Sequence, residues 1–508
     1  MTVRITPGQA WPVHGIASTR SMEQLAQALL PPHALMQRAG LAIAKLAMAL
    51  APHARAGWVA CGPGNNGGDG LEAAAHLQAW GWDVTVTHLP PTHRLPTDAA
   101  AALQRAQQAG VRFSPHAPPA LGLQDLAIDA LLGIGARPID PASPLADCLA
   151  ALARCAAPVL AVDVPSGLNA DNGQFAILSG ADSQGSTKAQ ARFHAKNTLT
   201  LLTLKPGLLM GEGRDASGTL WFNDLGVAAN LHPADAQLAV PAPRVVHPHA
   251  AHKGTRGDVA VLGGAPGMAG AALLAATAAL HAGAGRVFVA LLDTQGPTHR
   301  PEVNPQQPEL MFRSPDALDW QRSTLVCGCG GGEAVRALLP RALATPAALV
   351  LDADALNAVA TDTALRQLLV ARGARQRTTV LTPHPLEAAR LLGCSTTEVQ
   401  GDRLAAAQTL AVELNCVVVL KGSGTVVAAP GQVPLLNPTG NGRLGTAGTG
   451  DVLAGWLGAR LAQAGLIASA AQVQQYAAEV VFHHGQLADR WPSDPTLTAQ
   501  ALARAITA

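Results

Sequence analysis

Short runs of apolar residues alternate along the chain with longer Ala- and Leu-rich segments of helical periodicity. In the first half, the apolar runs predict strands at 57–61, 83–88, 126–130 and 158–162. In the second half the alternation restarts at Asp258 and predicts strands near 286–291, 348–352, 378–381 and 416–420. Buried strands that alternate with helices are typical of parallel sheets covered on both faces. The pattern therefore predicts an α/β fold in both halves.

The alternation lapses between residues 225 and 253. This stretch contains four prolines and no sustained periodicity, which is typical of an interdomain linker. A chain of 508 residues also exceeds what one hydrophobic core usually organises. We therefore predict a first domain at 1–230, a linker at 231–250 and a second domain at 251–508, with the boundary near residue 235.

Composition excludes several classes of partner. The formal net charge is +1 and aromatic residues make up 3% of the chain, so no basic face or stacking platform for nucleic acid is expected. Seven scattered cysteines are an odd number and fit no disulfide framework. The first residues carry no secretory signal pattern. We therefore predict a cytoplasmic protein, and we expect Cys327 and Cys329 to be strand-end residues rather than zinc ligands.

One uncharged stretch, 259–285, has the length of a membrane span. Four glycines and Pro266 gather in its first half, which favours a strand, a loop and a buried helix. We therefore predict no membrane partner.

A glycine-rich run in the first half has the pattern of a phosphate-binding loop. Gly62, Gly64 and Gly67 form G-x-G-x-x-G between a predicted strand and a helix expected to begin near Leu71. The alternative is a tight turn without a ligand, but the additional glycines and asparagines favour a ligand. Asp129 and Asp163 each follow a predicted strand, and ligands of open parallel sheets bind at the carboxyl ends of strands.

Three motifs then make a family resemblance. NNGGDG at 65–70, DALLGIG at 129–135 and VDVPSGLN at 162–169 resemble the N-terminal domain of the NAD(P)H-hydrate epimerase family, a Rossmann-like three-layer sandwich. The resemblance implies that Asp163 is catalytic and also contacts the substrate, and that a potassium ion is bound by Asn66, Asp129 and Ser166. The other substrate-binding residues that it implies are Asn65, Asn66, Gly67, Gly68, Asp69, Gly133, Ile134, Gly135, Ala136, Arg137, Pro138 and Ile139.

The second half carries a further set of strand-end motifs. The glycine-rich run 445–451 leads into a helical pattern, which places backbone N–H groups at an anion site and Asp451 where it can take a proton from a hydroxyl. The alternative is a glycine-rich turn with Asp451 as helix cap. Lys421 and His384 also follow predicted strands.

TPHP at 382–385, KGSGT at 421–425 and GTGD at 448–451 resemble the ADP-dependent NAD(P)H-hydrate dehydratases of the ribokinase-like fold. The resemblance implies that Asp451 is catalytic. It also implies that the hydrated cofactor contacts Ala271, Gly332, His384 and Asp451, and that the adenine nucleotide contacts Lys421, Gly422, Ser423, Gly424, Thr425 and Gly450.

Together the two resemblances predict an enzyme that repairs hydrated NADH and NADPH. The first domain would interconvert the R and S hydrates, and the second would dehydrate the S form, with Mg²⁺ present and ADP converted to AMP and phosphate. A homo-oligomer is expected. The alternative is a ribokinase-like vitamin kinase fused to a nucleotide-sensing module, because the GTGD loop suits any hydroxyl that is to be phosphorylated.

Overall fold

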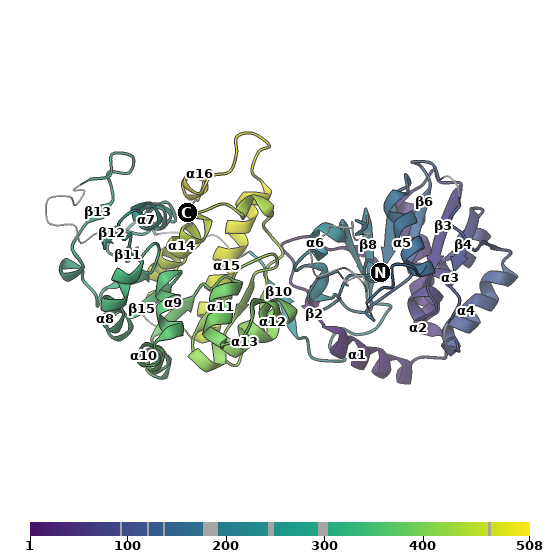
Figure 1. Cartoon of the computed structure of the whole chain (residues 1–508), viewed down its shortest axis with the longest axis horizontal. Coiled ribbons are helices and arrows are strands. Elements are labelled where there is room, and N and C mark those ends of the chain that lie inside the picture. Colours follow the sequence, from purple (N-terminus) through teal and green to yellow (C-terminus); the bar gives the residue numbers. More distant parts are fainter. Residues whose placement is uncertain are drawn as a thin grey trace. The chain divides into compact units, whose positions relative to one another are not determined.

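The computed structural model describes residues 1–91, 94–118, 121–135, 138–175, 192–241, 248–292, 303–465 and 469–507. It divides into two compact units, Met1–Ala236 and Gln237–Ala508 (Figure 1). Each unit contains a mainly parallel sheet and helices, so the predicted α/β class is confirmed.

The first unit contains an eight-stranded sheet in the order β1-β9-β8-β7-β6-β3-β4-β5. Its strands are β1 (Val3–Arg4), β3 (Ala56–Cys61), β4 (Asp83–His88), β5 (Arg112–Phe113), β6 (Leu126–Ala130), β7 (Val159–Val162), β8 (Asn197–Leu201) and β9 (Thr219–Asn223), and a short β2 (Pro12–Val13) precedes the first helix. Neighbouring strands run parallel, except that β1 is antiparallel to β9. The four predicted strands match β3, β4, β6 and β7 to within one residue at each end.

Helices of the first unit pack on both faces of this sheet. They are α1 (Ile16–Leu29), α2 (Ala34–Leu50), α3 (Asn65–Ala79), α4 (Thr97–Gln108), α5 (Pro144–Arg154) and α6 (Gly213–Ala216). Val59 packs in a core with α2, α3 and α4, whereas its neighbour Trp58 packs in a separate core with α5. Successive strand residues point to opposite faces, so the unit has three layers.

Helix α3 begins at Asn65, six residues before the position predicted from the sequence. The glycines that suggested a loop lie inside the helix, where they allow close packing. A Cβ at Gly67 would lie 1.9 Å from the carbonyl oxygen of Gly62, and one at Gly70 would lie 2.5 Å from the Cβ of Ala130. The first turn of α3 therefore lies directly against the ends of β3 and β6, which a bulkier sequence would prevent.

The second unit contains strands in the order β13-β12-β11-β14-β15-β16-β17-β18-β19-β10. Their bounds are β10 (Ala236–Leu238), β11 (Asp258–Gly263), β12 (Arg286–Leu291), β13 (Met311–Phe312), β14 (Ser323–Cys327), β15 (Ala348–Leu351), β16 (Thr378–Leu381), β17 (Val417–Leu420), β18 (Val426–Ala428) and β19 (Leu435–Leu436). Neighbours run parallel except for β18, which is antiparallel to β17 and β19. Strand β10 lies within the segment predicted to be a linker.

The helices of the second unit are α7 (Ala269–His281), α8 (Leu339–Ala344), α9 (Asp354–Thr361), α10 (Thr363–Ala374), α11 (Pro385–Leu392), α12 (Thr396–Gly401), α13 (Arg403–Leu414), α14 (Thr449–Ala464), α15 (Ala470–Asp489) and α16 (Ala499–Arg504). Helices α7, α14, α15 and α16 share one core with alternate valines of the sheet. The uncharged stretch 259–285 forms β11, a loop and α7, as predicted. None of the described helices combines the length and apolar character needed to cross a membrane.

Each sheet has a point where the chain changes direction across the sheet. Strand β3 lies between β4 and β6, and β11 lies between β12 and β14. The loops after β3 and β6 therefore diverge to opposite faces, as do those after β11 and β14. Such points form crevices at the carboxyl ends of strands. The candidate sites of both units lie at these edges.

Candidate functional site

A cavity of about 630 Å³ opens at the carboxyl edge of the first sheet. Its walls come from α1, the first turns of α3 and the loops after β6, β7 and β8. The predicted residues that line it are Asn65, Asn66, Asp69, Gly133, Ile134, Gly135, Pro138 and Asp163. Gly67, Gly68 and Ile139 are buried beside it. Ala136 and Arg137 lie outside the described residues.

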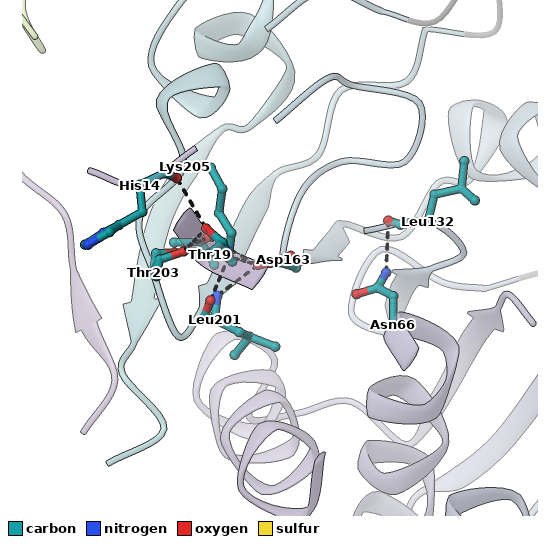
Figure 2. A network of polar contacts seen from close by, with 9 residues as sticks. His14, Thr19, Asn66, Leu132, Asp163, Leu201, Thr203 and Lys205 are labelled. Carbon is teal, nitrogen blue, oxygen red and sulfur yellow. Dashed lines mark hydrogen bonds and ion pairs between the residues drawn. The ribbon is translucent and has the colours of Figure 1, made fainter. Parts of the chain in front are cut away.

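Asp163 is held rigidly in this cavity. Its backbone adopts a positive φ of 66°, and its Oδ1 forms an ion pair with the Nζ of Lys205. The same Oδ1 accepts a hydrogen bond of 3.1 Å from the backbone N–H of Leu201 and one of 3.4 Å from the Thr200 hydroxyl. Figure 2 shows Lys205, Leu201 and Asp163 joined in this network. An acid fixed by several donors at an unusual backbone angle is typical of a functional position.

Lys205 is the residue that sequence reasoning missed at this site. It is 1% exposed and also donates a 2.6 Å hydrogen bond to the carbonyl oxygen of Leu201. A buried ammonium is stable only when it is paired. The available signal was its place in Leu-Lys-Pro-Gly, shortly after β8, but β8 itself was not predicted.

Asn66, Asp129 and Ser166 are brought together around Leu132. The Ser166 hydroxyl donates to Asp129 Oδ1 at 2.6 Å, and Asn66 Nδ2 donates to the carbonyl oxygen of Leu132 at 3.0 Å (Figure 2 shows the Asn66 contact). Asp129 is fully buried, and burial raises its pKa to about 6. The Asp129 carboxylate, the Ser166 hydroxyl and the Leu132 carbonyl each present an oxygen atom here. Rotation of the Asn66 side chain would add its amide oxygen. All of these potential metal ligands are therefore oxygen atoms. Such a set fits a hard cation.

Asp69 and Glu23 are among the carboxyl groups that line the cavity together with Asp163. Burial raises the pKa of Asp69 well above its usual value, and the charges of Asp163 and Glu23 act in the same direction. Burial likewise raises the pKa of Glu23, which lies on α1 and was not predicted as a site residue.

In the second unit, Lys421 and Asp451 face a shared cluster at the strand ends. Lys421 Nζ lies 2.7 Å from Asp352 Oδ1, which also accepts a 2.7 Å hydrogen bond from the Thr382 hydroxyl. Burial acts to lower the pKa of Lys421. The negative charges of Asp352 and Glu387 outweigh this effect and raise the pKa. Asp451 lies in the first turn of α14, and burial raises its pKa to about 6, assisted by the charge of Asp352. A partly buried carboxyl with this pKa can exchange protons near neutral pH.

Cys329, Asp352 and Asp451 offer atoms within 4.8 Å of one another. Burial, however, raises the pKa of the Cys329 thiol well above its usual value, and Lys421 already neutralises Asp352. A protonated thiol and a paired carboxylate do not suit Mg²⁺, which prefers oxygen ligands and near-ideal octahedral geometry. The cluster therefore does not fit a resident magnesium site.

The buried side chain of Arg403 anchors the predicted nucleotide loop, residues 421–425, through hydrogen bonds. This guanidinium is 2% exposed and donates to the carbonyl oxygens of Leu420, Lys421 and Gly424 at 3.1 to 3.3 Å. Gly422 has a φ of 138°, a conformation that favours glycine. A Cβ at Gly450 would lie 3.3 Å from Lys421 Nζ, so the loop and the start of α14 meet. Ser423 and Thr425 belong to the same loop, and the Thr425 hydroxyl donates to the carbonyl oxygen of Gly422 at 3.0 Å.

His384 has a structural role that the sequence analysis did not predict. Its Nδ1 accepts hydrogen bonds from the backbone N–H groups of Leu386 and Glu387 and thereby caps α11. Its ring is nearly half exposed, and its Nε2 lies 3.3 Å from Oε1 of Glu387, so both ring nitrogens have partners within α11. Ala271 lies in the first turn of α7 and Gly332 in the loop after β14, and both lie near Met268.

A buried histidine supports the loop that carries Asp451. His484 Nε2 lies 3.0 Å from the carbonyl oxygen of Thr449, and burial lowers the pKa of His484 to about 4. Above pH 6.5 the ring is neutral in both folded and unfolded chains. Between about pH 6.5 and 4 only the unfolded chain binds the proton, so the free energy of unfolding should fall by on the order of 1.4 kcal/mol per pH unit.

Denaturant titrations of the wild-type chain and of His484→Gln across this range would measure the effect. Glutamine keeps a donor for Thr449 but does not titrate. The difference between the two chains should therefore shrink as the pH falls. A difference that stays constant from pH 7 to 4.5 would contradict this account.

Comparisons with known proteins identify the family of each half of the chain. Residues 259–508 match the family described as NAD(P)H-hydrate dehydratase, and residues 32–207 match the family described as YjeF-related protein N-terminus. A crystal structure of the ADP/ATP-dependent NAD(P)H-hydrate dehydratase of Bacillus subtilis is 29% identical, with a TM-score of 0.41, and the match covers 52% of this chain and 91% of that one.

Two curated relatives match over most of their length. The bifunctional NAD(P)H-hydrate repair enzyme of Escherichia coli is 36% identical over 444 residues, which cover 84% of this chain and 80% of the relative. The enzyme of the same name from Coxiella burnetii is 36% identical over 489 residues, which cover 93% of each chain. The resemblance drawn from the motifs is confirmed, and the chain belongs to the family of bifunctional NAD(P)H-hydrate repair enzymes.

Proposed function

We propose that this chain restores hydrated NADH and NADPH. The first unit interconverts the R and S hydrates, and the second dehydrates the S form while ADP is converted to AMP and phosphate. The observation that carries this function is the match to bifunctional repair enzymes along 93% of the chain, which includes both strand-end sites. Because a chiral pocket accepts one epimer, the first activity makes the other half of the damaged pool available to the second.

In the first unit, we assign the cavity to the hydrated dinucleotide. The start of α3, with Asn65 and Asn66, presents backbone N–H groups to a phosphate. Asp163 is then the group that moves a proton, because its carboxylate lines the same cavity and is fixed by Lys205.

We also propose that Asn66, Asp129 and Ser166 hold a potassium ion. The buried Asp129 carboxylate and the oxygens gathered around Leu132 support this assignment. The ion would supply positive charge beside the loop that follows β6. It would thereby fix the wall of the cavity that Gly133 and Ile134 form.

In the second unit, the difficulty of the reaction is that hydroxide is a poor leaving group. Asp451 takes the proton of the substrate hydroxyl. At the same time the hydroxyl oxygen accepts the terminal phosphoryl group of ADP, and AMP departs. Phosphate then leaves the carbon next to the ring nitrogen. Loss of a proton from the neighbouring carbon restores the double bond. The backbone N–H groups at the start of α14 are placed to receive the transferred phosphate.

We propose that the loop 421–425, which begins with Lys421, binds the phosphates of ADP. Gly450 lies where this loop contacts the start of α14. Mg²⁺ would enter on the nucleotide, since the nearby protein groups do not fit it as a resident ion.

The cytoplasm suits seven free cysteines, five of which are buried. A homo-oligomer stays a prediction.

Absorbance at 340 nm tests the function directly. Purified protein is added to an equal mixture of both NADH hydrates with Mg²⁺, K⁺ and either ADP or ATP. Full recovery of NADH with ADP is expected, because both activities reside in one chain. Recovery of half of the NADH would support the dehydratase activity and exclude the epimerase activity. No recovery with either nucleotide would favour the vitamin kinase.

A further inference from the structure

Four carboxyl groups and the buried ammonium of Lys205 line the epimerase cavity, and one of the four, Asp98, is paired with His33. Glu23 from α1, Asp69 from α3 and Asp163 after β7 all line the cavity, as does Lys205. Lys205 is paired with Asp163. Arg20 also lines the cavity and acts on Glu23, but it is not among the charges that act on Asp69. The carboxyl groups therefore do not have equal access to a positive partner.

Asp163 has one engaged oxygen and one open oxygen. Its Oδ1 receives Lys205, the backbone N–H of Leu201 and the Thr200 hydroxyl. Among the described residues, no donor contacts Oδ2. A carboxylate with one engaged and one open oxygen is arranged to accept a proton on the open oxygen.

Asp69 has the opposite surroundings. No hydrogen-bond donor among the described residues contacts its side chain. Asp163, Glu23 and Glu72 are negative charges that raise its pKa, and the positive charge of Lys205 opposes them. Burial together with these charges raises the pKa of Asp69 well above its usual value, which favours the protonated form of its carboxyl group. A protonated carboxyl group can donate.

We propose that Asp69 is the proton donor that complements Asp163 in epimerisation. The proposal rests on the epimerase function proposed above. Asp163 takes the proton of the hydroxyl, the oxygen electrons form a carbonyl, and the bond from that carbon to the ring nitrogen breaks. The nitrogen receives its proton from Asp69. The carbonyl group rotates, and the reverse steps close the ring on the opposite face, so that both acids regain their starting states.

Two observations favour Asp69 over Glu23 as the donor. Asp69 lies on α3, three residues after Asn66, within the segment that presents N–H groups to the dinucleotide. Its helix is also packed tightly there, since a Cβ at Gly68 would lie 2.5 Å from Met36 Cε. Glu23 instead has a longer side chain and contacts Gln27 at 3.5 Å. A short side chain on a fixed helix is the better-positioned donor.

The test follows interconversion of the separated R and S hydrates by chromatography, without ADP, so that only the first activity is measured. Asp69→Asn should lower kcat about a hundredfold, the scale of one lost proton transfer, with KM within threefold of wild type. Wild-type kcat should fall at high pH as Asp69 loses its proton, and this decline should be absent in Asp69→Asn. Asp69→Glu should recover part of the lost rate, and Glu23→Gln should lose less than tenfold.

Dehydration of pure S hydrate with ADP should be unchanged in Asp69→Asn, which would confine the effect to the first activity, and an unchanged KM for epimerisation would show that the first unit is folded. Asp83→Asn is the matched control, since Asp83 is an exposed acid of the first unit paired with Arg112. An Asp69→Asn chain with kcat within threefold of wild type, or with a changed KM alone, would overturn the proposal. A wild-type chain that never interconverts the hydrates would overturn the proposed function and this proposal together.

Discussion

Replacing Asp451 with Asn should lower the kcat of dehydration about a thousandfold, within the range that general base catalysis contributes. The substitution keeps the size of the side chain in the first turn of α14 but removes its capacity to take the hydroxyl proton. Substrate binding depends on the loops around it, so KM should change little. Because burial raises the pKa of Asp451 to about 6, wild-type kcat should rise with pH through that value and then level off.

The measurement is absorbance at 340 nm with pure S hydrate, ADP and Mg²⁺. Asp316→Asn is the control, because Asp316 is an exposed acid of the same unit that is 93% exposed and paired only with Arg341. Epimerisation by the Asp451→Asn chain should match that of wild type, which would show that the chain is folded. Dehydration at more than a tenth of the wild-type rate would rule out Asp451 as the base.

The strand-end acids could be predicted because their positions follow from simple rules. A buried apolar run ends, an acid follows, and parallel strands place their carboxyl ends at one edge. Asp129 lies near the carboxyl end of β6 and Asp163 directly follows β7, and the structure places both at the same edge of the sheet. The sequence could also predict strands with continuous apolar runs, such as β3 and β17, but not β8 or β9, in which polar residues interrupt the run. It could not predict β1, β5 or β13, since two residues carry no periodicity.

The partners of these acids could not be predicted, because they depend on distant segments. Lys205 is 42 residues from Asp163, and Glu23 reaches the cavity from a helix that the strand pattern does not place. The extent of α3 was also missed, since glycines normally disfavour helices and are tolerated here by the close contact with β3. His384 capping α11 likewise depends on a side-chain rotamer that sequence spacing does not determine.

Replacing Asp163 with Asn should lower the kcat of epimerisation about a thousandfold and leave dehydration of S hydrate unchanged. Asparagine tolerates the positive φ of this position and can still accept hydrogen bonds on Oδ1 from Leu201 and Thr200. The loss should therefore come from proton transfer rather than from backbone strain. With an equal mixture of hydrates, the variant should recover half of the absorbance at 340 nm at once and the rest only slowly.

Lys205 should act as a positioning residue, and its variants separate position from chemistry. Lys205→Met removes the ammonium that holds Asp163 Oδ1, so kcat should fall while KM for the hydrates stays near the wild-type value. Lys205→Arg retains a positive donor and should recover part of the rate, which a merely structural role for the buried side chain would not produce. Asp83→Asn again serves as the exposed-acid control.

Full recovery of absorbance by Asp163→Asn at the wild-type rate would show that another group moves the proton. In that case the ion pair with Lys205 would be structural only.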